Sequence, residues 1–127
     1  MSKFENLEQK RALNAFQACS GTVFGGVNQG EVVKKLPPMI RENGMLGTLA
    51  FALSKNDKGA GFVNAFDAIR LHLVSIGKIN AKDLSAFQQD LMTCPPLKLR
   101  DVTTETMLYL DYLRRFAKKD KTKVSDK

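Results

Sequence analysis

The single histidine of the chain, His72, is the first side chain to consider for proton-transfer chemistry. A histidine acts as a catalytic base only when the fold brings it a nucleophile or a carboxylate, and no residue near His72 in the sequence marks such a partner. His72 also lies near the edge of an apolar helical stripe, where a packed or partly exposed histidine is the commoner case. We therefore predict no catalytic residue and no enzyme.

Other residue types that hold metals, phosphates or substrates lack the required spacing. Cys19 and Cys94 are 75 positions apart, without further cysteines or clustered histidines, so no zinc site is expected. Gly25-Gly26 lacks the Lys-Ser/Thr pair that completes a phosphate-binding loop. We predict no metal, no cofactor and no small-molecule substrate. With no export signal or membrane span expected, the two thiols are predicted to be reduced in a cytoplasmic protein.

Positive charge points more clearly to a partner. The 127 residues include 20 Lys and Arg against 13 Asp and Glu, a formal net charge of +7. Residues 98–127 hold nine basic and five acidic side chains, and further basic points lie at Lys10-Arg11 and around Lys34-Lys35. Phosphate groups favour clustered Lys and Arg because binding releases counterions. We expect an anionic partner; the alternative is that these charges only keep the protein soluble.

The elements that would position these side chains are helices, since apolar residues recur at three- and four-residue spacing along most of the chain. The clearest stripe is Phe62, Phe66, Ile69, Leu73 and Ile76. Further helices are expected over residues 5–23, 31–36, 46–54, 80–92 and from residue 103.

Particular residues should end, break or begin these helices. Gly77 should end the helix over residues 62–76, and Asn43-Gly44 should close a turn. Pro37-Pro38 should either start a short helix or kink the preceding one, and Asn80 should cap the helix that follows it.

No segment alternates as a half-buried strand does. The sequence therefore predicts an all-α protein, a compact bundle of about six helices. Residues 1–119 should form a single helical domain, and residues 120–127 a disordered basic tail. The off-stripe residues Val63, Leu71 and Val74 fit either a protein contact or cover by a second helix of the same bundle.

Three segments in register resemble a known family. Residues 34–51 combine a Lys-Leu-Pro step, an apolar pair, a glycine turn and a Leu-Ala-Phe helix. Residues 112–117 close a helix as Tyr-Leu-Arg-Arg-Phe-Ala, and residues 7–12 open the first one. Together they resemble the small subunit of the type III-B CRISPR effector, the Cmr complex. Tyr112 stands where this family usually has tryptophan, and Leu99 where it has another aromatic residue.

This resemblance implies a non-catalytic subunit of an RNA-guided, RNA-targeting effector complex in antiviral defence. Its partners would be the backbone subunit, further copies of itself, and the guide and target RNA, whose duplex it would face with a basic surface. By match to the family's motifs, the residues expected to contact phosphates are Arg11, Lys35, Arg41, Arg114 and Arg115, followed by Lys10 and Lys118. Two alternatives stay open: a small helical DNA-binding regulator, and a helical adaptor that binds no nucleic acid.

Overall fold

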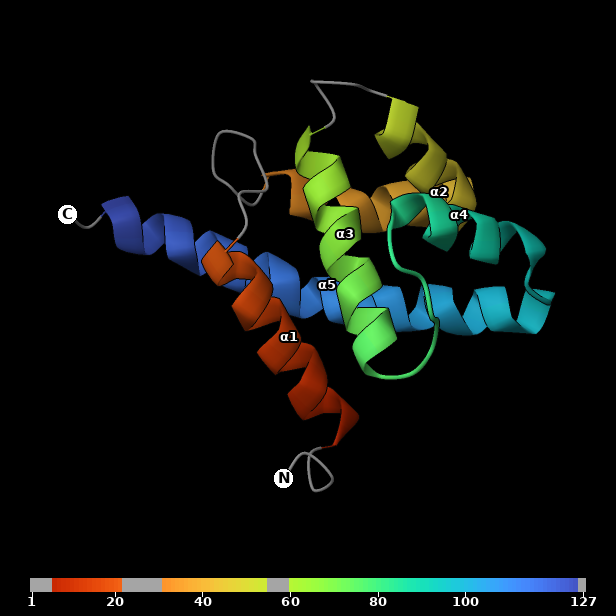
Figure 1. Ribbon diagram of the computed structural model, residues 1–127. Coiled ribbons are helices and arrows are strands. Elements are labelled where there is room, and N and C mark those ends of the chain that lie inside the picture. The colour runs from red at the N-terminus through yellow and green to blue at the C-terminus, as the bar shows by residue number, and fades with distance from the viewer. Residues whose placement is uncertain (1–5, 22–30, 55–59, 126–127) are drawn as a thin grey trace.

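The computed structural model describes residues 6–21, 31–54 and 60–125, apart from the side chains of residues 60 and 118–125. This part of the chain forms five helices and no strand: α1 (Leu7–Gly21), α2 (Glu31–Ser54), α3 (Ala60–Ser75), α4 (Leu84–Thr93) and α5 (Pro96–Ser125). The long helix α5 crosses the whole molecule, and α1, α2 and α3 pack against it (Figure 1). Helix α4 packs on α2 and α3. The predicted all-α class is confirmed.

Helix α2 explains why five helices are found where about six were expected, because it joins the stretches predicted as separate helices over residues 31–36 and 46–54. It continues through Pro37-Pro38, and only Gly44 within it leaves the helical region, with φ 82° and ψ 163°. A proline in a helix interior costs about 3 kcal/mol or more, because it removes a hydrogen-bond donor and crowds the preceding turn. Val33, Leu36 and Ile40 lie on one face of this stretch and are almost fully buried. Burying side chains of this size stabilises by about 1.5–3 kcal/mol each, which offsets the cost. The break in helical backbone angles therefore lies at the predicted glycine turn and not at the prolines.

The apolar stripe predicted around residues 62–76 forms the centre of the core. Phe66, Ile69 and Leu73 are fully buried, and the two outer members of the stripe pack against the core half-buried. Gly77 ends the helix as predicted, with φ 78°. Its N–H donates to the Val74 carbonyl at 3.0 Å, and the next N–H donates to Leu73 at 2.9 Å. This pair of bonds is the Schellman motif, which satisfies carbonyls left open at a helix end.

Two helices start at residues other than those predicted. Asp83, and not Asn80, caps α4: its carboxylate accepts from the N–H of Ala86 at 2.9 Å. A carboxylate at this position is also favoured by the helix dipole. Helix α5 begins at Pro96 rather than near Thr103. Proline suits a first helical residue, because its preset φ is helical and the N–H it lacks has no partner there.

Helix α5 extends from Pro96 to Ser125. No glycine or proline follows Pro96 in the sequence, and lysine, which is frequent near this end, is a good helix former. The predicted division into a helical domain over residues 1–119 and a disordered tail over residues 120–127 stays a prediction.

Helix α1 buries less apolar surface than its sequence suggested. Ala15 is fully buried, but Leu13 is 43% and Phe16 57% exposed. Phe16 meets Phe116 of α5 edge to face, with ring centroids 5.6 Å apart. Apolar burial alone therefore fixes α1 weakly, and polar contacts must contribute to its attachment.

The turn inside α2 gives a matched pair of stability predictions. We expect Gly44→Ala to lower the free energy of unfolding by about 1–3 kcal/mol, because φ 82° with ψ 163° is a region open essentially only to glycine. Gly47→Ala is the control: its helical Cβ would meet only the Asn43 Cβ at 3.4 Å. It should be neutral or stabilising by up to about 1 kcal/mol. Urea denaturation followed by circular dichroism measures both, and equal stability of the two variants would contradict the role given to Gly44.

Candidate nucleic-acid interface

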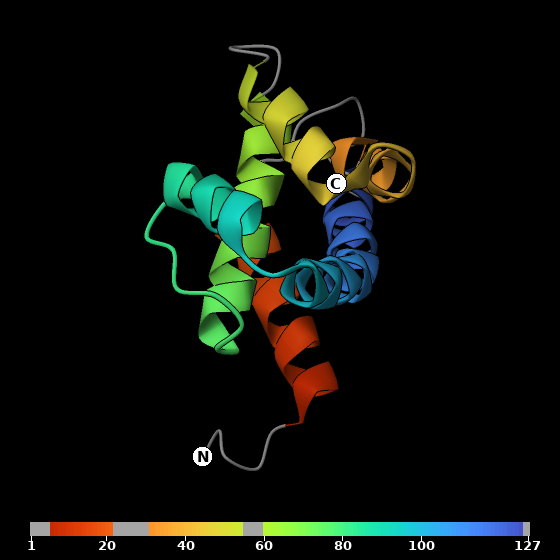
Figure 2. The ribbon, with the colours of Figure 1, turned by 90° about the vertical axis from the view of Figure 1, so that its right-hand side faces the viewer.

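Exposed basic side chains lie on the two longest helices. On α2, Lys34, Lys35 and Arg41 are exposed, and none of them makes an ion pair with the described residues. The first half of α2 runs alongside α5 in the opposite direction (Figures 1 and 2). These cations keep their charge available to an outside partner.

Helix α5 carries the second group. Arg114 and Arg115 are 44% and 66% exposed and share Asp111, at N–O distances of 3.0 and 3.5 Å. Exposed pairs of this kind contribute only about 0–1 kcal/mol, so a phosphate could replace Asp111 as their partner. Arg100 is also exposed and has no ion pair within the described residues. It precedes Arg114 by 14 residues, close to four helical turns, and so lies on nearly the same face. Arg100 was not among the predicted phosphate contacts, although its spacing from Arg114 can be read from the sequence.

Arg11 is placed differently from the other predicted residues. Its guanidinium donates twice to Glu105 of α5, from Nε at 2.7 Å and from Nη2 at 2.8 Å. The side chains are 16% and 4% exposed, respectively. A phosphate would have to displace a bidentate, largely buried carboxylate to reach this guanidinium. Nearby Lys10 is half-buried and has no ion pair among the described side chains, and the side chain of Lys118 lies outside them.

His72 of α3 completes a network around Glu105. The buried imidazole contacts Glu105 through Nε2 at 2.8 Å and Asn14 through Nδ1 at 2.8 Å. Because the Asn14 amide nitrogen is the donor to Nδ1, the proton of the neutral ring lies on Nε2 and is donated to Glu105. The ring also stacks on Tyr109, with centroids 4.3 Å apart and an 8° angle between planes. His72 is thus a packed residue with its nitrogens satisfied.

Burial and hydrogen bonding shift the pKa values in this network in known directions. Burial lowers the pKa of His72 below its usual value, and this effect outweighs the attraction of Glu105. Burial raises the pKa of Glu105, but the hydrogen bonds from Arg11 and His72 together bring it below its usual value. At neutral pH the network therefore holds a carboxylate, a guanidinium and a neutral imidazole. We call these three side chains, with Asn14, the Glu105 network.

Other predicted features can be located as well. Cys19 and Cys94 are half-buried thiols, and no disulfide joins them. In the part of the chain that the structure describes, no group of three His, Cys, Asp or Glu could hold a metal ion.

None of the described helices is long and apolar enough to cross a membrane. Leu71 is 54% exposed, while Val63 and Val74 are half-buried, so the described helices leave the off-stripe residues only partly covered.

Comparison with known proteins gives one finding about the family. Residues 7–119 match the sequence profile of the family described as CRISPR-associated protein (Cas_Cmr5). No curated protein and no solved structure matches the chain. The family match confirms the resemblance to the Cmr small subunit drawn from three segments of the sequence.

The contrast between Arg11 and its neighbour Lys10 is testable. Arg11→Gln leaves the carboxylate of Glu105 buried without its bidentate partner, and breaking a buried pair costs about 3–5 kcal/mol. We expect about 2–3 kcal/mol, since Arg11 keeps 16% exposure. Lys10→Gln removes the same charge from the same helix and should change stability by less than about 0.5 kcal/mol. Chemical denaturation measures both. Similar losses of unfolding free energy in the two variants would show that the pair of Arg11 with Glu105 contributes no more to stability than Lys10 does.

Because the chain has one histidine, a change in stability near pH 6 can be assigned to His72. A lowered histidine pKa means that the unfolded chain binds the proton first as pH falls below about 6.5. The stability from neutral His72 is therefore complete above that pH and is lost as pH falls toward the folded-state pKa. Glu105 adds a further loss below about pH 4.5, since its pKa is also lowered.

We expect the unfolding free energy of the wild type to fall between pH 7 and pH 5.5, and that of His72→Gln to change much less over this range. Denaturation at several pH values, with NMR titration of the imidazole, provides the measurement. A pH profile unaffected by the substitution would exclude His72 as its source.

Proposed function

The chain belongs to the Cas_Cmr5 family of CRISPR-associated proteins, and from this membership we propose that it is a non-catalytic small subunit of the Cmr effector complex. In this proposal it packs beside the backbone subunit and further copies of itself. The exposed basic side chains of α2 and α5 lie along the duplex of guide and target RNA. Antiviral defence is the process in which such a complex would act.

The observation that carries this proposal is the spacing of the exposed cations along α5 and α2. Arg100 and Arg114 lie on nearly one face of α5, about 21 Å apart at 1.5 Å per residue. Lys34, Lys35 and Arg41 add charge on the neighbouring helix. A row of separate cations on helices suits a line of phosphates better than a compact ligand, because each cation can meet a different phosphate. Such contacts give affinity without reading the base sequence, which fits a complex that reads sequence by base pairing.

Arg11 is not part of the proposed surface. Its charge is balanced by Glu105 inside the bundle, so it adds little to the field outside. The proposed phosphate-contacting residues are Lys34, Lys35, Arg41, Arg100, Arg114 and Arg115.

Arg114 and Arg115 offer the sharpest test, because Asp111, which pairs with both, supplies a variant with the opposite effect. We expect Arg114→Gln with Arg115→Gln to weaken binding of duplex RNA and to reduce the slope of log affinity against log salt by about 1–2, since each lost phosphate contact removes about 0.9. Asp111→Asn frees both arginines and should strengthen binding. Filter binding or fluorescence anisotropy at several salt concentrations measures these effects.

Lys82→Gln serves as the control, since Lys82 is an exposed lysine on neither α2 nor α5. If the double arginine variant bound duplex RNA with the affinity and salt slope of the wild type, the proposed surface would be overturned. Two further outcomes would favour the alternative functions. Protection of one particular DNA sequence would indicate a DNA-binding regulator, and no retention on RNA at low salt would indicate an adaptor.

A further inference from the structure

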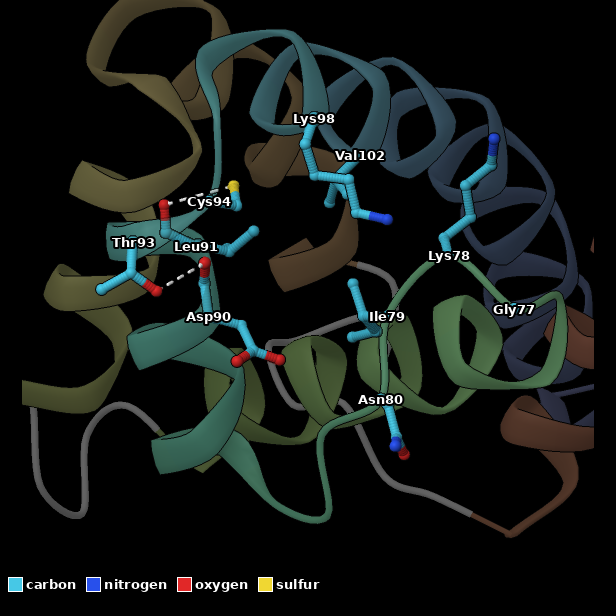
Figure 3. A pocket seen from close by; sticks show the side chains of 10 residues that line it. All are labelled: Gly77, Lys78, Ile79, Asn80, Asp90, Leu91, Thr93, Cys94, Lys98 and Val102. Atoms are coloured by element: carbon cyan, nitrogen blue, oxygen red, sulfur yellow. Dashed lines mark hydrogen bonds between the residues drawn. The ribbon is translucent and has the colours of Figure 1, made fainter.

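A cavity of about 400 Å³ opens between the loop after α3, the end of α4 and the first turns of α5 (Figure 3). None of the residues proposed above to contact the RNA duplex lines it. A ligand in this cavity would therefore bind apart from the RNA duplex, and its binding does not depend on the proposed function.

The floor of this cavity is apolar. Val102 of α5 is fully buried and Leu91 of α4 is 2% exposed. Ile79, in the loop, packs half-buried against the core beside them. Of these three side chains, Ile79 keeps exposed surface, so a flat apolar group could lie against it.

Opposite charges stand on two walls above this floor. Lys98 reaches from α5 across the opening toward Ile79, and the carboxylate of Asp90 faces the same space from α4 (Figure 3). No ion pair within 4.0 Å joins the two, and neither pairs with any other described residue. The cavity thus presents one available cation and one available hydrogen-bond acceptor, held apart by apolar surface.

The charge of Lys98 is poorly compensated by its surroundings. It lies in the first turn of α5, which contains no acidic residue. A cation at this end of a helix is disfavoured by the helix dipole. The closest acid along the helix, Asp101, already pairs with Lys78 at 3.0 Å. An anion bound at Lys98 would balance this charge.

We propose that the cavity binds a single nucleotide. Its phosphate lies at Lys98, the face of its base lies against Ile79, and an amino group of the base donates to Asp90. The volume is within the usual range for small-molecule sites, about 300–1,000 Å³. A free amino acid fits less well, since its carboxylate and ammonium share one carbon and cannot reach two separate walls. The same chemistry is offered by a free nucleotide and by one nucleotide of a single strand.

Cytidine and uridine monophosphates test the proposal as a matched pair, because cytosine has an amino donor where uracil has a carbonyl. The full-length ¹⁵N-labelled protein is titrated with each and followed by NMR. We expect saturable shifts of the Ile79, Leu91 and Lys98 amides, with cytidine monophosphate binding about tenfold more tightly. Asp90→Asn should remove most of this preference, because an amide can meet either base. Lys98→Glu should weaken both ligands about tenfold or more, while Lys82→Glu, outside the cavity, should leave both unchanged.

Further probes separate the sources of the ligand. Binding of oligocytidine with the same shifts assigns the site to a strand, whereas binding of the monophosphate alone assigns it to a free nucleotide, and both outcomes support the proposal. Inorganic phosphate binding as tightly as cytidine monophosphate would overturn the role of the base. Absence of saturable shifts at these amides would overturn the site itself. Neither failure affects the duplex surface, which the arginine variants of α5 test independently.

Discussion

A buried carboxylate, that of Glu105, is the constraint on which the attachment of α1 depends. An ionised carboxylate at 4% exposure is costly unless cations and donors surround it. Arg11 of α1 supplies two hydrogen bonds, and His72 of α3 supplies a third. Three helices from distant parts of the sequence are therefore held at one point, with a geometry that the fork of the guanidinium fixes in both angle and register. This matters most for α1, whose larger apolar residues are partly exposed. Apolar contact alone holds α1 weakly, and the pairing with the carboxylate adds to its attachment and determines where along α5 it lies.

The same constraint divides the basic residues into two kinds. Arg11 and Arg115 are both arginines beside an acid, but they are 16% and 66% exposed, respectively. Where water is excluded, the pair is structural, and its charge is cancelled inside the molecule. Where water is present, the pair is weak and its cation can exchange partners. The formal charge of +7 is thus a count of side chains and does not measure the surface that an RNA would meet.

Sequence reasoning succeeded where a local rule determines the structure. The stripe through Phe66 and Leu73 follows from helical periodicity alone, and the bends at Gly44 and Gly77 follow from backbone angles that glycine adopts without strain. It was wrong where a tertiary contact overrides a local rule: Pro37-Pro38 stays helical because the face around it is buried. It could not have found the pairing of Arg11 with Glu105, which are 94 residues apart. Nothing near either residue in the sequence distinguishes a buried pair from two solvated charges, and the family resemblance placed Arg11 among the expected phosphate contacts.

One helix joins the buried network to the proposed RNA surface. The inner face of α5 carries Glu105, with Tyr109 and Leu113 fully buried beyond it, and the outer face carries Arg100 and Arg114. Because a single helix carries both faces, fixing the inner side chains also fixes the spacing of the outer ones at 1.5 Å per residue. A partner then has to order only the arginine side chains, since folding has already ordered the backbone that bears them. The packing of α5 therefore does more than stabilise the bundle. It sets the spacing of the arginines along the proposed surface, and it would lower the conformational cost of each proposed phosphate contact.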